Sequence, residues 1–444
     1  MTSLIITAPR VIPALPGSGV LEPGFVRIAD GRISEVGQGR PPGRPDLELT
    51  SGVLVPGLVD LQVNGYFGVE LMAADPDGWA AVAAGLPGTG CTAFLPTFVT
   101  APVPRLADAL RRAAGFAGRL PDRGARVLGV HLEGPFISPA RRGAHNPDWI
   151  IPASPAAVAE LLAAGEGLLR LVTLAPEVDG GMTAIGQLTA AGVLVSVGHS
   201  DATAAQVAAA AGAGARMVTH LYDAQRPLHH REPGVVGQAL ADPRLTSGLI
   251  ADLHHVSAVA CAVAFAAAPG RICLVTDAAA CAGRPPGEYL LGGERIVLSP
   301  GDGAPPRRAD GTLAGSVLRL DRAVDNMVST VLARGDDPPE PPDRRSAPSG
   351  GRPPRRGGDD PPGPPDRRSA PSGGKPPRQR AGDGNSILAA VVAAASRIPA
   401  DLIGRPDLGR LRPGAAADVV LLSPDLHTVG TVIGGRLFES KSVS

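Results

Sequence analysis

The sequence is poor in cysteine, poor in aromatic residues and without net charge. Its 444 residues include four cysteines, and no two of them have CxxC spacing. Disulfide-built domains are short and rich in cysteine, so separate reduced thiols are expected here. The 42 basic and 42 acidic residues balance, which removes the general electrostatic reason for binding nucleic acid or an anionic membrane. With 3% aromatic residues, the core must be built from Ala, Val, Leu and Ile.

Long apolar segments are also missing. The Ala-rich run 203–215 is too short to span a membrane and is interrupted by Gln206 and by glycines. The first residues lack a basic segment followed by an apolar one, so no signal peptide is expected. These features predict a cytoplasmic protein that has no membrane or nucleic-acid partner.

One segment differs from the rest in composition. Residues 336–358 and 359–381 are two copies of a sequence rich in Pro, Gly, Ser and Arg, and they match at 18 of 23 positions. Neither copy has an aromatic or large aliphatic residue, so the segment cannot bury enough apolar surface to offset its conformational entropy. We predict a disordered, duplicated insertion in a surface loop over 335–385. A Pro-rich ligand for a recognition domain is the alternative.

The chain between 53 and 280 alternates short apolar runs with Ala-rich stretches. Two of these stretches, 156–164 and 203–212, favour helices by propensity. Apolar strands that alternate with helices at roughly thirty residues per unit predict an α/β fold, a (β/α)8 TIM-like barrel. A doubly wound open sheet is the competing topology. The eight predicted strands are 57–63, 92–99, 126–133, 169–176, 193–199, 216–221, 245–252 and 271–277.

Polar residues gather at the C-terminal ends of the predicted strands. Eight of the nine histidines lie between 131 and 255, and several of them share this position. The loops at the C-terminal face of a barrel assemble its active site, which favours the barrel over the open sheet. The polar strand ends are Gln62, Asn64, His131, Glu133, His199, His220 and Asp277.

These residue types suit hydrolysis assisted by a metal. Glu133, His199 and His220 offer one carboxylate and two imidazoles, a set that binds a borderline divalent metal and leaves a position open for water. Asp277 could take the proton of that water and pass it to a leaving group. His145 could donate a hydrogen bond to the developing oxyanion. The alternative for Asp277 is a structural one, the N-cap of a helix beginning at DAAA.

Several motifs occur in an order that resembles a known family. The sequence closely resembles the N-acetylglucosamine-6-phosphate deacetylases of the amidohydrolase superfamily, from about Leu54 to Ile403. Each motif alone is weak, whereas their order and spacing are specific. The motifs are HLEGPF (131–136), GAHNP (143–147), VSVGHSDAT (195–203), THLYDA (219–224), REPG (231–234), LVTDAAACAG (274–283), GTLAGS (311–316), RLRPGAAADVVLLSPD (410–425) and TVIGGR (431–436).

The resemblance implies two domains and one activity. A barrel at 54–407 would carry catalysis, and both chain ends, 1–53 and 408–444, would form a small β-sandwich. GR at 31–32 and GGR at 434–436 are typical of turns within those ends. The implied reaction is deacetylation of N-acetyl-D-glucosamine 6-phosphate to glucosamine 6-phosphate and acetate, in amino-sugar catabolism and cell-wall sugar recycling. A homodimer is implied as well.

The resemblance also implies a role for individual residues. Glu133, His199 and His220 match the metal ligands, Asp277 matches the general base that later protonates the amine, and His145 matches the group that contacts the acetyl carbonyl. The metal would be zinc, with iron, manganese or cobalt as alternatives, since N and O ligands accept all of them. The positions that match sugar-phosphate binding are Ala144, His145, Asp223, Ala224, Arg231, His255, Leu313, Ala314 and Gly315, some of them acting across a dimer interface.

Two positions depart from the pattern. Many amidohydrolases place His-x-His after the first strand to hold a second metal, whereas this chain has Gln62 and Asn64, so we predict one metal. In THLYDAQ (219–225) the family usually has Asn-Ala-Met, and Asp223 places a carboxylate near the expected phosphate.

Three rival functions remain at this point. The first is a deacetylase of another N-acetylhexosamine phosphate, such as N-acetylgalactosamine 6-phosphate, because loop geometry distinguishes hydroxyl stereochemistry. The second is a cyclic amidohydrolase, which would favour two metals. The third is a non-catalytic barrel that binds a partner. The pair His229–His230 is expected to be a solvated or phosphate-facing loop, because adjacent side chains rarely point the same way.

Overall fold

The structure is a computed structural model that describes residues 3–118, 124–301, 303–333 and 384–439. The predicted insertion (335–385) lies outside these residues except for Gly384 and Asn385, which begin helix α9 (Gly384–Ala395). No helix in these ranges is both long enough and apolar enough to cross a membrane.

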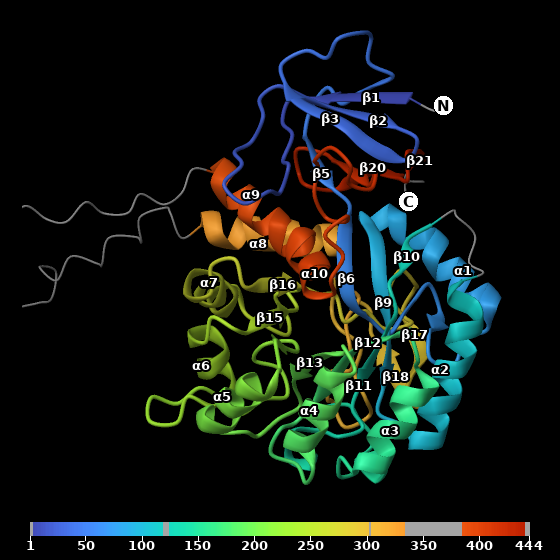
Figure 1. Cartoon of the computed structure of the whole chain (residues 1–444), viewed down its shortest axis with the longest axis vertical. Coiled ribbons are helices and arrows are strands. Elements are labelled where there is room, and N and C mark those ends of the chain that lie inside the picture. The colour runs from blue at the N-terminus through green and yellow to red at the C-terminus, as the bar shows by residue number, and fades with distance from the viewer. Residues whose placement is uncertain (1–2, 119–123, 302, 334–383, 440–444) are drawn as a thin grey trace, which may run out of the picture.

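Eight parallel strands form a nearly closed barrel, and each predicted apolar run contributes one of them (Figure 1). The row closes where Val63 forms a bridge to Ala278 and the Asp277 amide donates to the Gln62 carbonyl at 2.9 Å. The barrel is therefore confirmed over the open sheet. Its strands are β6 (Leu58–Val63), β9 (Cys91–Val99), β11 (Val130–Glu133), β12 (Leu169–Leu174), β13 (Leu194–Val197), β14 (Met217–Val218), β15 (Thr246–Leu249) and β16 (Ile272–Leu274), with β10 (Arg126–Val127) also paired to β9.

Helices follow the strands along the chain and lie outside them (Figure 1). Both predicted Ala-rich helices are present, as α3 and α5. At the start of α5, Thr203 and Gln206 form a capping box that satisfies backbone donors of the first turn. The helices are α1 (Pro76–Gly85), α2 (Val103–Ala117), α3 (Pro155–Ala164), α4 (Gly181–Ala190), α5 (Ala204–Ala213), α6 (Gly234–Ala241), α7 (Ala258–Ala267), α8 (Leu320–Leu332), α9 and α10 (Arg397–Leu402), with short 3-10 turns η1 (Leu86–Thr89), η2 (Pro139–Arg141) and η3 (Pro147–Trp149).

Both chain ends build two small sheets beside the barrel (Figure 1). The first has the order β3-β2-β1-β4 and the second β21-β20-β19-β5. Ile6, Ile28, Leu54 and Val419 share one buried cluster, so the two sheets pack against each other. The exact domain bounds stay a prediction. The strands are β1 (Ser3–Ala8), β2 (Gly24–Ala29), β3 (Arg32–Gln38), β4 (Leu47–Glu48), β5 (Val53–Pro56), β19 (Val419–Leu422), β20 (Thr428–Ile433) and β21 (Arg436–Glu439).

Two hairpins extend the barrel near its C-terminal face. The smaller joins β7 (Gly65–Tyr66) to β8 (Val69–Glu70), and the larger joins β17 (Gly287–Leu291) to β18 (Glu294–Leu298). Leu291, Ile296 and Leu298 of the larger hairpin pack with Val99 at the end of β9 in a separate apolar cluster. This packing brings the hairpin turn to the mouth of the barrel.

Candidate active site

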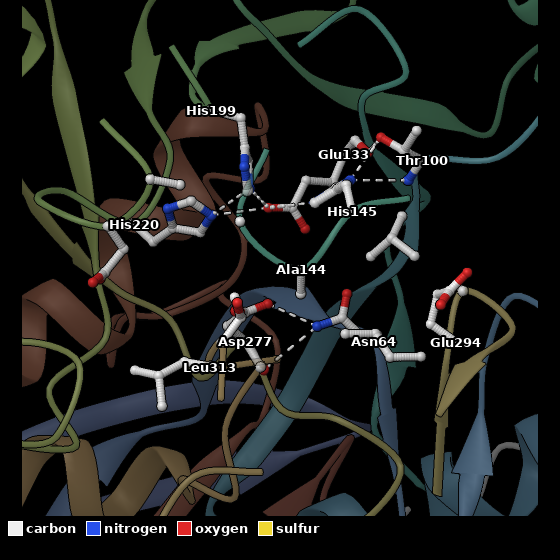
Figure 2. Close-up of a pocket in the computed structure, with 18 of the residues that line it drawn as sticks. Asn64, Thr100, Glu133, Ala144, His145, His199, His220, Asp277, Glu294 and Leu313 are labelled. Carbon is white, nitrogen blue, oxygen red and sulfur yellow. Dashed lines mark hydrogen bonds and ion pairs between the residues drawn. The ribbon is translucent and has the colours of Figure 1, made fainter. Parts of the chain in front are cut away.

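The C-terminal ends of the barrel strands surround one pocket, where most of the predicted site residues meet (Figure 2). His199, His220 and Asp277 each follow a strand by two or three residues and have positive φ angles of 46°, 27° and 51°. Residues other than glycine adopt this backbone at a cost, and such positions cluster at functional sites. The lining includes Asn64, Thr100, Glu133, Ala144, His145, His199, His220, Asp223, Ala224, His255, Asp277, Leu313 and Gly315, together with Asn146, Trp149 and Glu294.

Three buried side chains converge on one point in this pocket. Nε2 of His199 lies 3.0 Å and Nε2 of His220 lies 2.9 Å from Oε1 of Glu133, and the two nitrogens are 3.2 Å apart. A tetrahedral zinc ion with ligand bonds of about 2.0 Å separates its ligand atoms by about 3.3 Å, close to these values. The buried Glu/His/His group can therefore hold a divalent metal.

The orientation of His199 supports this use. Its Nδ1 lies 2.9 Å from the carbonyl oxygen of Arg141, so Nδ1 carries the proton and Nε2 keeps its lone pair. Nδ1 of His220 has no partner among the described residues. Among the described residues, a protein group therefore holds His199, but not His220, in the tautomer that binds a metal through Nε2.

The charges of the three residues are strongly coupled. Burial alone would raise the pKa of Glu133, but the hydrogen bonds from His199 and His220 outweigh burial and hold it well below its usual range. For His220, burial alone would lower the pKa, whereas the hydrogen bond to Glu133 raises it to about 9. A metal ion held by these three residues would replace the proton that His220 otherwise carries.

His145 is close enough to be an alternative ligand. Glu133, His145 and His199 also have ligand atoms within 4.8 Å of one another. However, the Thr100 amide donates to Nδ1 of His145 at 3.3 Å, and the Thr100 hydroxyl lies 2.6 Å from the same nitrogen. An accepting Nδ1 places the proton on Nε2, which faces Glu133 at 4.0 Å. A protonated Nε2 is a hydrogen-bond donor, so His220 is the better third ligand.

Asp277 lies opposite this group and is held by two side-chain amides. Nε2 of Gln62 and Nδ2 of Asn64 both donate to its Oδ1, at 3.0 and 2.7 Å. Burial, together with the charge of Glu133, raises the pKa of Asp277 to about 7, a value suited to a general base. No helix begins at Asp277, because α8 is the next helix along the chain, so the alternative role as a helix N-cap is wrong.

The pocket also contains further ionisable side chains. Asp223 and His255 line it, and Asp252 accepts a 2.6 Å hydrogen bond from Nδ1 of His255. Burial alone would lower the pKa of His255, but its bond to Asp252 raises it above the usual value. Burial raises the pKa of Asp223, and its Oδ2 is buried without a partner among the described residues.

Only some of the remaining predicted residues lie in the pocket. Ala144, Ala224, Leu313 and Gly315 line the pocket, and Ala314 is buried in the apolar cluster of the β17–β18 hairpin. Arg231 does not line the pocket in this chain: it is exposed, and its guanidinium contacts the neighbouring His230. His229 and His230 are also exposed, in agreement with a solvated loop, and all four cysteines are buried as free thiols.

Several residues around the pocket could not be identified, or were not predicted, from the sequence. Thr100 follows the second barrel strand and Asp252 ends the seventh predicted run, so the strand-end pattern could have identified both. Glu294 accepts hydrogen bonds from Asn146 at 2.7 Å and Arg308 at 3.1 Å, which ties the hairpin to the loop of His145. No sequence pattern indicates that the hairpin reaches this loop.

Comparison with known proteins finds clear relatives, although no family model matches the chain. N-acetylgalactosamine-6-phosphate deacetylase of Escherichia coli O157:H7 is 41% identical over 314 residues, which cover 71% of this chain and 81% of the relative. N-acetylglucosamine-6-phosphate deacetylase of Bacillus subtilis (strain 168) is 37% identical over 314 residues, covering 69% of this chain and 78% of the relative.

Solved structures agree with these relatives. N-acetyl-D-glucosamine-6-phosphate deacetylase of Mycobacterium smegmatis, an Asp-to-Ala variant in complex with N-acetyl-D-glucosamine-6-phosphate, has a TM-score of 0.82 and 31% identity over 98% of this chain and 99% of that one. Enamidase, a member of the amidohydrolase superfamily, is 13% identical with a TM-score of 0.56 over 99% of this chain and 97% of that one, which shows a shared fold alone.

Proposed function

The chain belongs to the N-acetylglucosamine-6-phosphate deacetylase family, and we propose that it hydrolyses the acetamide of N-acetyl-D-glucosamine 6-phosphate to D-glucosamine 6-phosphate and acetate. The observation that carries this proposal is a buried Glu/His/His group facing a carboxylate, Asp277, that two amides hold in place. The enzyme would be a hydrolase of linear amides that serves amino-sugar catabolism and cell-wall sugar recycling.

The metal site is proposed to hold one ion through Glu133, His199 and His220. When bound, a divalent metal supplies Lewis acidity that activates water and polarises an acyl oxygen. Gln62 and Asn64 use their amide nitrogens on Asp277, which supports a single metal rather than two. Zinc is the proposed metal, with iron, manganese and cobalt as alternatives that the same ligands accept.

Asp277 and His145 would carry the proton transfers and the oxyanion contact. Asp277, with its pKa near 7, takes a proton from the attacking water and later gives it to the departing nitrogen. His145 donates from Nε2 to the acetyl oxygen as negative charge develops on it. The contacts of Thr100 with Nδ1 keep the proton on the nitrogen that faces the pocket.

The sugar phosphate would occupy the rest of the pocket. The residues proposed to contact it are Ala144, His145, Asp223, Ala224, His255, Leu313 and Gly315, with Ala314 supporting this loop from the apolar cluster behind it. Arg231 is exposed on its own chain, which supports a homodimer in which this loop reaches the pocket of a second copy. Leu228 in the same loop is 56% exposed, as expected of a residue that a second copy covers. Sedimentation of the wild type and of Arg231→Ala, with activity assays on both, tests this part.

A second substrate has specific support. The relative that is 41% identical is named N-acetylgalactosamine-6-phosphate deacetylase, so the 4-hydroxyl configuration of the sugar is open. The two candidates share all the chemistry and differ at a single hydroxyl. Comparison of kcat/KM for both phosphorylated sugars decides between them.

The test of the proposed function is acetate release by metal-reconstituted protein. N-acetylglucosamine 6-phosphate, N-acetylgalactosamine 6-phosphate and unphosphorylated N-acetylglucosamine are assayed together. We expect turnover of a phosphorylated sugar only. If the metal is bound and none of the three is cleaved, the non-catalytic barrel or a different substrate replaces this proposal.

The balanced charge of the chain supports a small-molecule partner rather than nucleic acid or a membrane. The cytoplasmic location stays a prediction from the sequence. Cell fractionation with an antibody against the chain tests it.

A further inference from the structure

One buried hydrogen-bond acceptor in the pocket has no partner in the described part of the chain. Asn64 is 2% exposed, and its side-chain Oδ1 accepts no hydrogen bond from the described residues. Asn64 nevertheless lines the pocket. Buried polar atoms are almost always satisfied, so an unpaired acceptor that faces a pocket indicates that a ligand supplies the donor.

The orientation of this amide is determined by its neighbours. Nδ2 of Asn64 lies 2.7 Å from Oδ1 and 3.4 Å from the backbone oxygen of Asp277. The reverse orientation would place the Asn64 oxygen against two acceptors, so it is disfavoured. The backbone is fixed as well, because the Asn64 amide donates to Ala278 at 2.8 Å and its carbonyl accepts from Leu71 at 2.9 Å. In Figure 2 the amide nitrogen faces Asp277 and the oxygen faces away from it, toward the side of Glu133 and His145.

The position of the free oxygen restricts which donor can reach it. Oδ1 and Nδ2 belong to one planar carboxamide, so a single side chain can hold a bound group through Oδ1 and Asp277 through Nδ2. In the proposed reaction, Asp277 must reach the nitrogen of the scissile amide. That nitrogen carries the one N–H donor of the acetamide. The donor that fits the free oxygen of Asn64 is therefore the N–H of the scissile amide.

We propose that Oδ1 of Asn64 accepts the N–H of the substrate acetamide while its Nδ2 holds Asp277, so that one side chain positions both partners of the second proton transfer. This inference rests on the proposed function and adds a substrate contact to it. The N–H bond stays intact throughout. When the C–N bond breaks, both its electrons remain on nitrogen, and Asp277 delivers to that lone pair the proton it took from water. The products are acetic acid, which keeps the second hydrogen of the water and ionises to acetate, and an amine that carries the original hydrogen and the new one.

The contact has a geometric consequence for catalysis. An amide nitrogen must become pyramidal before it can accept a proton. When the hydrogen of this nitrogen points at Asn64, the lone pair that forms on the nitrogen lies next to Asp277. Asn64 would thus favour substrates with a secondary amide over esters, which have no N–H at this position.

Gln62 provides a matched control within the same site. It donates to the same Oδ1 of Asp277, at 3.0 Å, but it is not among the residues that line the pocket. Removal of Gln62 therefore loses a contact to Asp277 only, whereas removal of Asn64 loses the contact to Asp277 and the contact to the substrate.

The experiment compares two substrates in three proteins. Wild type, Asn64→Leu and Gln62→Leu are assayed for kcat and KM with N-acetylglucosamine 6-phosphate and with 2-O-acetylglucose 6-phosphate, the ester that lacks the N–H. We expect Gln62→Leu to lower kcat for both substrates by the same factor. Asn64→Leu should lower kcat for the amide by about tenfold more than for the ester, the effect of one lost hydrogen bond.

Equal losses for amide and ester in Asn64→Leu would overturn the inference and leave Asn64 as a support for Asp277 only. Metal content and Tm of each variant show whether it is folded. Asn64→Ala repeats the comparison with a smaller side chain if the leucine variant does not fold. Failure of the proposed function gives a different result, because the wild type itself would then cleave neither phosphorylated sugar.

Discussion

The two ends of the pocket are built in different ways. The acyl end (Glu133, His145, His199, His220 and Asp277) consists largely of residues at or just after barrel strands, and protein groups hold most of them in place. The proposed sugar end (Asp223, Ala224, His255 and Leu313) consists of loop residues and includes the Asp223 carboxylate, whose Oδ2 has no partner among the described residues. Among the described residues that line the pocket, none is an arginine or a lysine.

This difference separates the residues proposed for catalysis from the residues proposed for substrate recognition. The acyl end can carry out its chemistry with groups from a single chain. A phosphate dianion is usually held by paired donors such as those of arginine, and among the described residues of the proposed sugar end only His255 can carry a positive charge. We therefore expect recognition of the substrate to depend on a loop such as that of Arg231, and the reaction itself to proceed without it.

The largest expected effect is at the acyl end. Asp277→Asn keeps the shape of the side chain but cannot accept a proton, so kcat should fall about a thousandfold. Because Asp277 is not in the Glu/His/His group, the metal content measured on the purified variant should match that of the wild type. Asp252→Asn, which changes a carboxylate at the sugar end, should affect KM far more than kcat. Near-normal turnover by Asp277→Asn would remove this residue from the mechanism.

Replacement of His145 tests which residues hold the metal. His145→Gln should lower kcat about a hundredfold through the loss of an oxyanion donor, with the metal retained. His220→Ala should lose the metal instead. Metal analysis of the two variants distinguishes these outcomes, and the reverse result would make His145 the third ligand.

The pH dependence of the reaction tests the ionisation of Asp277, at the same acyl end of the pocket. Asp277 works as a base only when ionised, so kcat/KM should rise as the pH increases through its pKa. Burial places that pKa near 7. A bound metal cation favours the ionised form, so the acidic limb should lie at or below pH 7. Gln62→Leu removes a hydrogen-bond donor to the ionised carboxylate of Asp277 and so raises the pKa of this group. The acidic limb of kcat/KM should therefore move to higher pH. An unchanged limb in that variant would show that another group controls it.

A smaller effect is expected at the sugar end. Asp223→Asn removes a negative charge from the region where the phosphate is expected, so KM for the phosphorylated sugar should fall about threefold to tenfold with kcat little changed. The unphosphorylated sugar provides the control as a competitive inhibitor, because its inhibition constant contains no phosphate repulsion to lose. A higher KM for the phosphorylated sugar would show that the Asp223 carboxylate binds a hydroxyl donor of the substrate instead.

The smallest effect should come from the duplicated insertion, nearly all of which lies outside the described residues. Deletion of 336–380 is expected to leave kcat/KM within about twofold of the wild type, because loop length changes the closure entropy only slowly. Steady-state kinetics of the shortened chain checks this. A large loss of activity would assign the insertion a role that a tolerated loop does not have.

Much of the barrel could be predicted from local patterns. Strands such as β6 and β9 are buried along their whole length, as expected for parallel strands covered on both faces, so they occur as continuous apolar runs. The C-terminal end of each run then lies at the face of the barrel where an active site is expected. For this reason, Glu133, His199, His220 and Asp277 could be predicted together as site residues. The position of the hairpin of β17 and β18 could not be predicted, because it depends on packing against Val99, which is far away in the sequence.

The sequence by itself determined which residue types stand at the strand ends, since apolar periodicity and strand length are local properties. Only the tertiary structure decided how these residues pair. Asn64 and Asp277 meet because the closing bridge of Val63 with Ala278 brings the first strand beside the last. Thr100 determines which nitrogen of His145 is protonated by a contact across 45 residues. Such contacts depend on barrel closure and on the direction of each turn, and neither leaves a pattern in the local sequence.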